Sequence, residues 1–224
     1  MWVNRGDFWE CLAPQKSEEW LRARRGRVNG TDTGPLAGKS TFKTPEETGK
    51  IIAGIEEPVF LKENLEYMNH GVRSEPLARA WYEKNYKCKV LERGLCVPTW
   101  DTTIGTSVDG DIIGTDKILE IKSPRKMYGS ILKYMDAISA GWKPPPNYYD
   151  HIFPTHFAQM QQGMRILNKA YCDYVIYSTS DAKVFTQRIA FDPIYWEKHY
   201  AIIKQNYDLY VKPHLNGTYP IQPF

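Results

Sequence analysis

Two acidic residues and a lysine lie close together near the middle of the chain, at Asp109, Glu120 and Lys122. The segment 119–122 reads Leu-Glu-Ile-Lys, so a strand with a side-chain period of two places Glu120 and Lys122 on one face. Asp109 precedes this strand by one short apolar hairpin, and its carboxylate can join the pair. Two carboxylates suit Mg²⁺, and a neighbouring ammonium can orient water and neutralise charge on a phosphate. The pattern therefore predicts metal-assisted cleavage of a phosphodiester.

Composition and length set the class of protein. The chain has 224 residues, of which 42% are hydrophobic and 25% are charged, so we expect residues 1–224 to form one globular domain. No apolar run approaches the ~18 residues of a membrane span, and the N-terminus does not resemble a signal peptide. The four cysteines are scattered and have no metal-ligand spacing, which fits a reducing compartment. These features predict an intracellular protein.

The net charge of +3 is too small to indicate a nucleic-acid partner, but its distribution is uneven. Four arginines fall within six residues, at Arg22, Arg24, Arg25 and Arg27. The first three lie in a segment that begins with Ser17, a good N-cap, and ends at Gly26, which suits a left-handed helix C-terminus. The first arginines therefore lie on a short predicted helix.

The remaining elements follow from hydrophobic period and from Gly and Pro positions. We expect a mobile loop over 29–43, a helix from Thr44, a helix over 58–67, a break at Gly71 and a new helix from Ser74. Strands are expected within 89–122, at 171–178 and at 184–190, and helices at 128–140, from Pro154 and at 194–210. This order predicts an α/β (α+β) fold with a central mixed β-sheet flanked by helices.

Five segments, in this order along the chain, resemble the lambda-type exonucleases, also described as YqaJ-like viral recombinase nucleases, of the PD-(D/E)xK superfamily. They are the opening helix with its Arg-x-Gly turn, a Gly-x(3)-Glu helix, an Asp-Gly turn, the Glu-x-Lys strand and a Gln-x-Gln helix, at 15–28, 70–78, 106–110, 119–124 and 156–161. Val108 and Ser123 stand where the family often has Pro and Cys, and neither position supplies a metal ligand. The resemblance implies a restriction-endonuclease-like core.

The resemblance also implies roles for single residues. The metal ligands would be Asp109, Glu120 and the main-chain carbonyl of Ile121, and the metal would be Mg²⁺, with Mn²⁺ as a substitute. Lys122 would orient water and stabilise charge. It is not expected to act as a base, because a lysine base requires a lowered pKa and the neighbouring carboxylates raise it. Glu75 would be a further active-site carboxylate, although an acidic residue that opens a helix is often only a dipole partner.

Two more groups complete the implied site. Gln159 would lie by the attacking water or the scissile phosphate, with Gln161 and Gln162 as weaker candidates, although each could be an ordinary helix residue. A 5′-phosphate would be held by Arg24, Thr31 and Ser107, since a guanidinium fork matches a terminal phosphate. The alternative for Arg24 is an ordinary solvated arginine.

Together these features predict a Mg²⁺-dependent 5′-to-3′ exodeoxyribonuclease that acts on ends of linear double-stranded DNA and leaves 3′ single-stranded tails for recombination. One alternative is an endonuclease on the same fold, and another is a non-catalytic DNA-end-binding protein. The resemblance further implies a ring-shaped homotrimer, a single-strand annealing protein as a possible partner, and a phage or viral origin.

Overall fold

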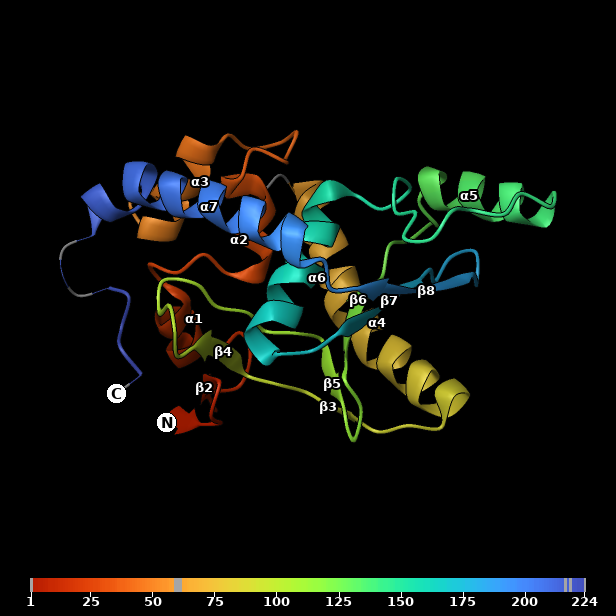
Figure 1. Cartoon of the computed structure of the whole chain (residues 1–224), viewed down its shortest axis with the longest axis horizontal. Helices are drawn as coiled ribbons and strands as arrows, with labels where there is room; N and C mark the ends of the chain where they lie inside the picture. The colour runs from red at the N-terminus through yellow and green to blue at the C-terminus, as the bar shows by residue number, and fades with distance from the viewer. Residues whose placement is uncertain (1, 59–61, 216, 218, 224) are drawn as a thin grey trace.

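The computed structural model describes residues 2–58, 62–215, 217 and 219–223. Its strands form two sheets (Figure 1). β1 (Trp2–Asn4), β2 (Phe8–Cys11) and β4 (Leu95–Pro98) make a small antiparallel sheet in the order β1-β2-β4. The larger sheet has the order β3-β5-β6-β7-β8, with strands β3 (Val90–Leu91), β5 (Gly110–Ile112), β6 (Lys117–Lys122), β7 (Tyr171–Tyr177) and β8 (Val184–Ala190). Only its β6–β7 pair is parallel, so the larger sheet is mixed, as predicted.

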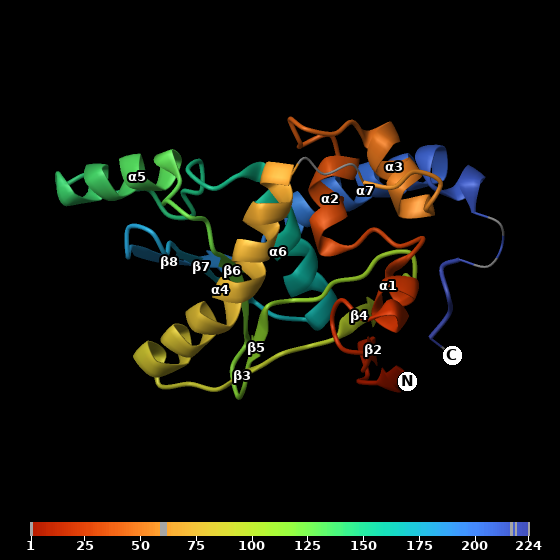
Figure 2. The same cartoon turned by 180° about the vertical axis from the view of Figure 1, so that it is seen from behind.

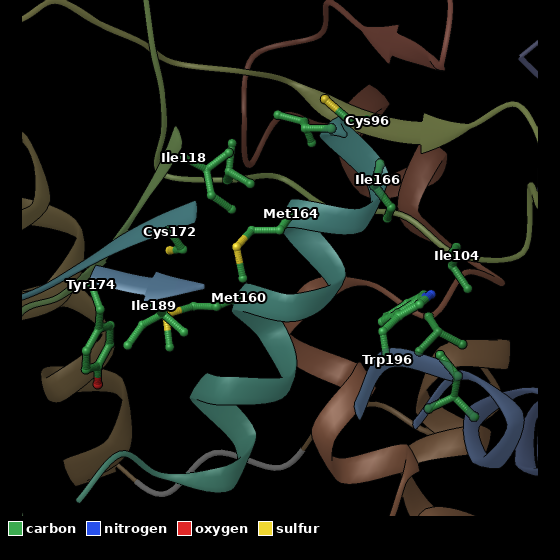
Figure 3. Packing of buried hydrophobic residues seen from close by; sticks show 14 of the residues in the cluster. Cys96, Ile104, Ile118, Met160, Met164, Ile166, Cys172, Tyr174, Ile189 and Trp196 are labelled. Carbon is green, nitrogen blue, oxygen red and sulfur yellow. The ribbon is translucent and has the colours of Figure 1, made fainter. Parts of the chain in front are cut away.

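One helix covers each face of the larger sheet. On one face, Met160 and Met164 of α6 (Pro154–Leu167) pack in a cluster with Ile118 of β6, as Figure 3 shows. On the other face, Ala78 and Tyr82 of α4 (Lys62–Tyr86) cluster with Leu119, Ile121 and Val175. Alternate β6 side chains therefore point to opposite layers, as a period of two requires. Glu120 and Lys122 share the α6 side with Ile118.

The other helices gather mainly at one end. Figures 1 and 2 show α2 (Gly30–Leu36), α3 (Pro45–Ala53) and α7 (Pro193–Tyr210) together there, and α5 (Gly129–Ser139) at the opposite end. The short elements α1 (Glu18–Arg24) and η1 (Lys212–His214) complete the chain. Two glycines permit close helix contacts. A Cβ on Gly34 would lie 2.9 Å from the Cα of Thr155, and one on Gly49 would lie 2.7 Å from the Tyr210 carbonyl oxygen.

Two sequence-based expectations about elements were wrong, and two strands were missed. The expected loop 29–43 contains α2, whose N-cap Asn29 donates its backbone N–H to Asp32 at 3.2 Å. Packing against α6, rather than intrinsic propensity, stabilises this Gly-, Thr- and Pro-rich helix. The expected break at Gly71 is absent, since α4 runs through both Gly71 and Pro76. Strands β1 and β2 were not predicted.

The expected helix over 58–67 falls partly at 59–61, outside the described residues; its later part belongs to α4. Within the described part of the chain, no helix is both long enough and apolar enough to cross a membrane.

Candidate functional site

The strand β6 and the helix α6 meet at three polar side chains. The Lys122 ammonium lies 2.6 Å from Oε1 of Glu120 and donates to Oε1 of Gln159 at 3.1 Å. Glu120 is only 2% exposed, so this ion pair is buried at the glutamate and reaches solvent at the lysine. The predicted shared face of Glu120 and Lys122 therefore exists, and α6 contributes Gln159 to it.

Asp109 joins this group through the hairpin between β5 and β6. Gly110 pairs with Leu119 in antiparallel register, which brings the residue before Gly110 beside the middle of β6. Oδ2 of Asp109 accepts the backbone N–H of Ile121 at 2.6 Å. The turn residue and the Glu-x-Lys strand thus form one site.

A third carboxylate comes from α4. Arg79 donates to Oε1 of Glu75 at 2.7 Å and, through Nε, to the backbone carbonyl of Asp109 at 3.0 Å. The pairing of Glu75 and Arg79 follows the i, i+4 spacing of a helix. Glu75 therefore stands beside the Asp109 segment, held by an arginine that contacts both.

The carboxyl groups raise one another's pKa. Burial, followed by the negative charge of Glu120, raises the pKa of Asp109 to about 7. Burial also raises the pKa of Glu120 and of Glu75, and Asp109 adds to the effect on Glu75. Burial alone would lower the pKa of Lys122, but the charges of Glu120 and Asp109 outweigh it and raise this pKa. The site thus concentrates negative charge beside a firmly protonated lysine.

A hard cation fits this arrangement. Among the described residues, no cluster of three or more His, Cys, Asp or Glu side chains is close enough to hold a metal by itself. Asp109 and Glu120 each use one carboxylate oxygen in a hydrogen bond, and no described residue hydrogen-bonds the other. Two carboxylate oxygens and the Ile121 carbonyl would form an all-oxygen set, which suits Mg²⁺ or Mn²⁺.

The three residues predicted to hold a 5′-phosphate also lie together. Arg24 donates to the Thr31 hydroxyl at 3.3 Å, and its guanidinium lies 4.3 Å from the ring centre of Trp20. Trp20 in turn donates its indole N–H to the Ser107 hydroxyl at 3.2 Å. Sequence reasoning missed Trp20 as a member of this group. Its position four residues before Arg24, on the same helix face, was the available signal.

This second group borders a cavity of about 700 Å³, whose lining includes Arg24, Thr31, Lys43 and Met68. Burial lowers the pKa of Arg24, while the nearby charge of Asp32 acts in the opposite direction. The guanidinium is therefore partly stripped of water, which strengthens its attraction for an anion.

The two groups are adjacent in space. A Cβ on Gly30 would lie 3.2 Å from Cγ of Gln159, and the next residue, Thr31, contacts Arg24. A second cavity, of about 560 Å³, lies on the Glu75 side and is bordered by Val72 and Arg79. Helix α4 thus borders both cavities.

The other two glutamines of α6 serve the fold. Gln162 is fully buried and donates to the carbonyls of Val28 and Gly105 at 2.9 and 2.8 Å. Gln161 bonds the Ala190 carbonyl and the Asp192 N–H. Of the three candidates, Gln159 is the one that contacts the carboxylate and lysine group.

Comparisons with known proteins find chains of similar fold. An alkaline exonuclease from Laribacter hongkongensis is similar at 24% identity and a TM-score of 0.66, over 88% of this chain and 94% of that one. The same exonuclease in complex with dAMP is similar at 25% identity and a TM-score of 0.60, over 88% and 92%. A phage-related exonuclease from Haemophilus somnus is similar at 13% identity and a TM-score of 0.53, over 84% and 93%. No curated protein matches the chain.

The predicted restriction-endonuclease-like fold, with its mixed sheet flanked by helices, is confirmed by these similarities and by the sheet order. The predicted enzyme class, a nuclease that hydrolyses DNA, is confirmed at the level of the family and its structural neighbours, and nucleases of this kind generally depend on a divalent metal. The profile of the YqaJ-like viral recombinase domain matches residues 19–170, more than half of the sequence. The chain therefore belongs to the YqaJ-like viral recombinase domain family.

Proposed function

We propose that residues 1–224 form one Mg²⁺-dependent exodeoxyribonuclease domain that degrades linear double-stranded DNA from the 5′ end and leaves 3′ single-stranded tails. The observation that carries this proposal is the joining of Asp109, Glu120, Lys122 and Gln159 at the meeting of β5, β6 and α6. Family membership supports DNA as the substrate. A structural neighbour bound to dAMP supports a mononucleotide product.

Asp109, Glu120 and the Ile121 carbonyl would hold the metal, and Glu75 would add negative charge beside it. A bound divalent metal supplies an acidified water and Lewis-acid polarisation of the phosphate. The raised pKa of Lys122 keeps its ammonium charged, so it would neutralise charge on the phosphate rather than remove a proton. Gln159 accepts from Lys122, which leaves its amide N–H groups to orient water or a phosphate oxygen.

Arg24, Thr31 and Ser107 would bind the terminal 5′-phosphate beside this centre. Arginine presents several N–H donors in one plane, which matches a phosphate with two charges. A DNA end alone offers such a group, so binding it selects ends over internal positions. A 5′-phosphorylated duplex should therefore be digested faster than a 5′-hydroxyl duplex.

Assembly and setting belong to the same proposal. We infer a homotrimer that encloses the DNA, a single-strand annealing protein as the partner that takes up the tail, and an intracellular place of action. Sedimentation at micromolar concentration tests the trimer, because a particle near the 26.0 kDa of one chain would contradict it. The nuclease assignment would stand in either case.

The deciding experiment uses linear duplexes labelled separately at each 5′ and 3′ end, together with a closed circular duplex, with and without Mg²⁺. We expect mononucleotide release from the 5′-labelled strand only, and an intact circle. Glu120→Gln should abolish release, whereas Asp208→Asn, at an exposed ion pair on α7, should not change it. Cutting of the circle would establish an endonuclease instead, and Mg²⁺-independent binding without turnover would establish an end-binding protein.

A further inference from the structure

Trp20 contacts both sides of the group proposed to hold the terminal phosphate. Its indole N–H donates to Ser107, and its ring lies against the guanidinium of Arg24. The side chain is only 8% exposed. It packs in a small apolar cluster on the three-stranded sheet, whose other buried members are Cys11, Ala13, Ala23, Leu95 and Val97. The three-stranded sheet therefore holds Trp20 in place, while its indole N–H contacts Ser107 and its ring contacts Arg24.

The direction of the hydrogen bonds leaves two hydroxyl hydrogens for a ligand. An indole nitrogen can only donate, so the Ser107 oxygen accepts from Trp20 and its own O–H hydrogen remains for another acceptor. A guanidinium also only donates, so the Thr31 oxygen accepts from Arg24 in the same way. A terminal phosphate with two charges presents acceptor oxygens and no donor. The site is thus matched to that ligand in the direction of each bond.

We propose that Trp20 is a positioning residue for 5′-phosphate recognition, which orients the Arg24 guanidinium and holds the Ser107 hydroxyl as a donor. The inference rests on the proposed function of Arg24, Thr31 and Ser107. A guanidinium stacked on an indole loses few orientations when a ligand binds, so less of the binding free energy is spent on ordering it. The small sheet that the sequence did not predict then has a function, which is to support Trp20.

Trp20→Phe tests this proposal, because phenylalanine keeps an aromatic ring against the Arg24 guanidinium but lacks the indole N–H that donates to Ser107. The measured quantity is the ratio of kcat/KM for a 5′-phosphorylated duplex to that for a 5′-hydroxyl duplex. We expect the ratio to fall about three- to tenfold, the range for loss of one hydrogen bond. Trp100→Phe is the matched control, since the centre of the Trp100 ring also lies 4.7 Å from an arginine guanidinium, that of Arg165. The control should leave the ratio unchanged.

A double-mutant cycle separates positioning from general stability. If the indole acts through Ser107, Trp20→Phe should lower the ratio in the wild type and have little further effect in a Ser107→Ala background. A purely structural role would instead slow both substrates equally and leave the ratio constant, which would overturn the proposal. An additive effect in the Ser107→Ala background would also overturn it.

The outcomes also distinguish this inference from the function on which it rests. A wild-type enzyme that digests DNA with Mg²⁺ but ignores the 5′-phosphate would refute phosphate recognition, and the role of Trp20 with it. A wild-type enzyme that prefers the 5′-phosphate, together with an unchanged Trp20→Phe ratio, would refute only the role of Trp20. Thermal unfolding of each variant verifies that it is folded before its ratio is interpreted.

Discussion

The metal-free protein should become more stable when Asp109 is replaced by Asn, although this substitution should abolish nuclease activity. Burial and the charge of Glu120 raise the pKa of Asp109 from its ordinary 3.8 to about 7 in the folded protein. Asparagine has nearly the same shape and never ionises. Its side-chain oxygen can still accept the Ile121 N–H that Asp109 accepts at 2.6 Å.

The sign and size of the effect follow from proton linkage. Between about pH 4 and pH 7 the folded protein holds a proton on Asp109 that the unfolded chain has lost, so stability falls as pH rises. A pKa difference of about 3 lowers the free energy of unfolding by at most about 4 kcal/mol. Because the Asp109 side chain is partly exposed, we expect about 2 kcal/mol. The full penalty is present above about pH 7. For a chain of this size, about 2 kcal/mol corresponds to a melting-temperature gain of about 4 to 8 °C.

Thermal or urea unfolding in EDTA at about pH 5 and about pH 8 would measure this gain. The advantage of Asp109→Asn should be small at the lower pH and near its maximum at the higher pH. Asp181→Asn is the control, because Asp181 also accepts a backbone N–H, from Met127 at 3.3 Å, but hydrogen bonds lower its pKa. A variant Asp109→Asn that is no more stable than the wild type at about pH 8 would refute the argument.

Further predictions concern the metal, Lys122, two glutamines and a buried histidine. Turnover should require Mg²⁺ or Mn²⁺ and fail with Ca²⁺, whose larger size and looser geometry suit the site less. Lys122→Met should lower kcat about 100-fold or more in a steady-state assay. Gln159→Ala should lower kcat without changing the melting temperature. Gln162→Ala should instead lower stability by about 2 kcal/mol in urea unfolding, because the buried Gly105 carbonyl loses its donor and the Val28 carbonyl keeps only the Gly105 N–H. Burial lowers the pKa of His199 to about 4, whereas in the unfolded chain this histidine binds a proton near pH 6.5. The free energy of unfolding should therefore fall by up to about 3 kcal/mol as pH falls from about 6.5 to 4. His199→Gln should flatten this pH dependence in unfolding experiments, while the same change at the exposed His214 should not.

The catalytic strand was predictable because its signal is local. The alternation in 119–122 alone placed Glu120 and Lys122 on one face, and the short hairpin placed Asp109 beside them. Each of these relations spans about a dozen residues or fewer. The order of strands and helices was likewise sufficient to predict a mixed sheet flanked by helices.

The missed features depend on contacts between distant parts of the chain. Helix α2 has the composition of a loop, and its close approach to Thr155 on α6 is visible only in three dimensions. Trp20 bonds to Ser107 across 87 residues, so its share in the site could not be derived from spacing. Gln159 and Gln162 have the same side chain and lie on one helix, but only the positions of their neighbours separate a site residue from a buried structural one.

The continuity of α4 has a consequence for how the two groups are held relative to each other. Met68 borders the cavity of Arg24, and Glu75 stands by the carboxylates, seven residues further along the same helix. Seven residues of α-helix span about 10 Å along the axis. With the roles proposed above, one continuous helix borders both the cavity of the proposed phosphate group and the carboxylates of the proposed metal site, so the two are held in a fixed relation. A helix that broke at Gly71 would lack this direct connection between the two groups.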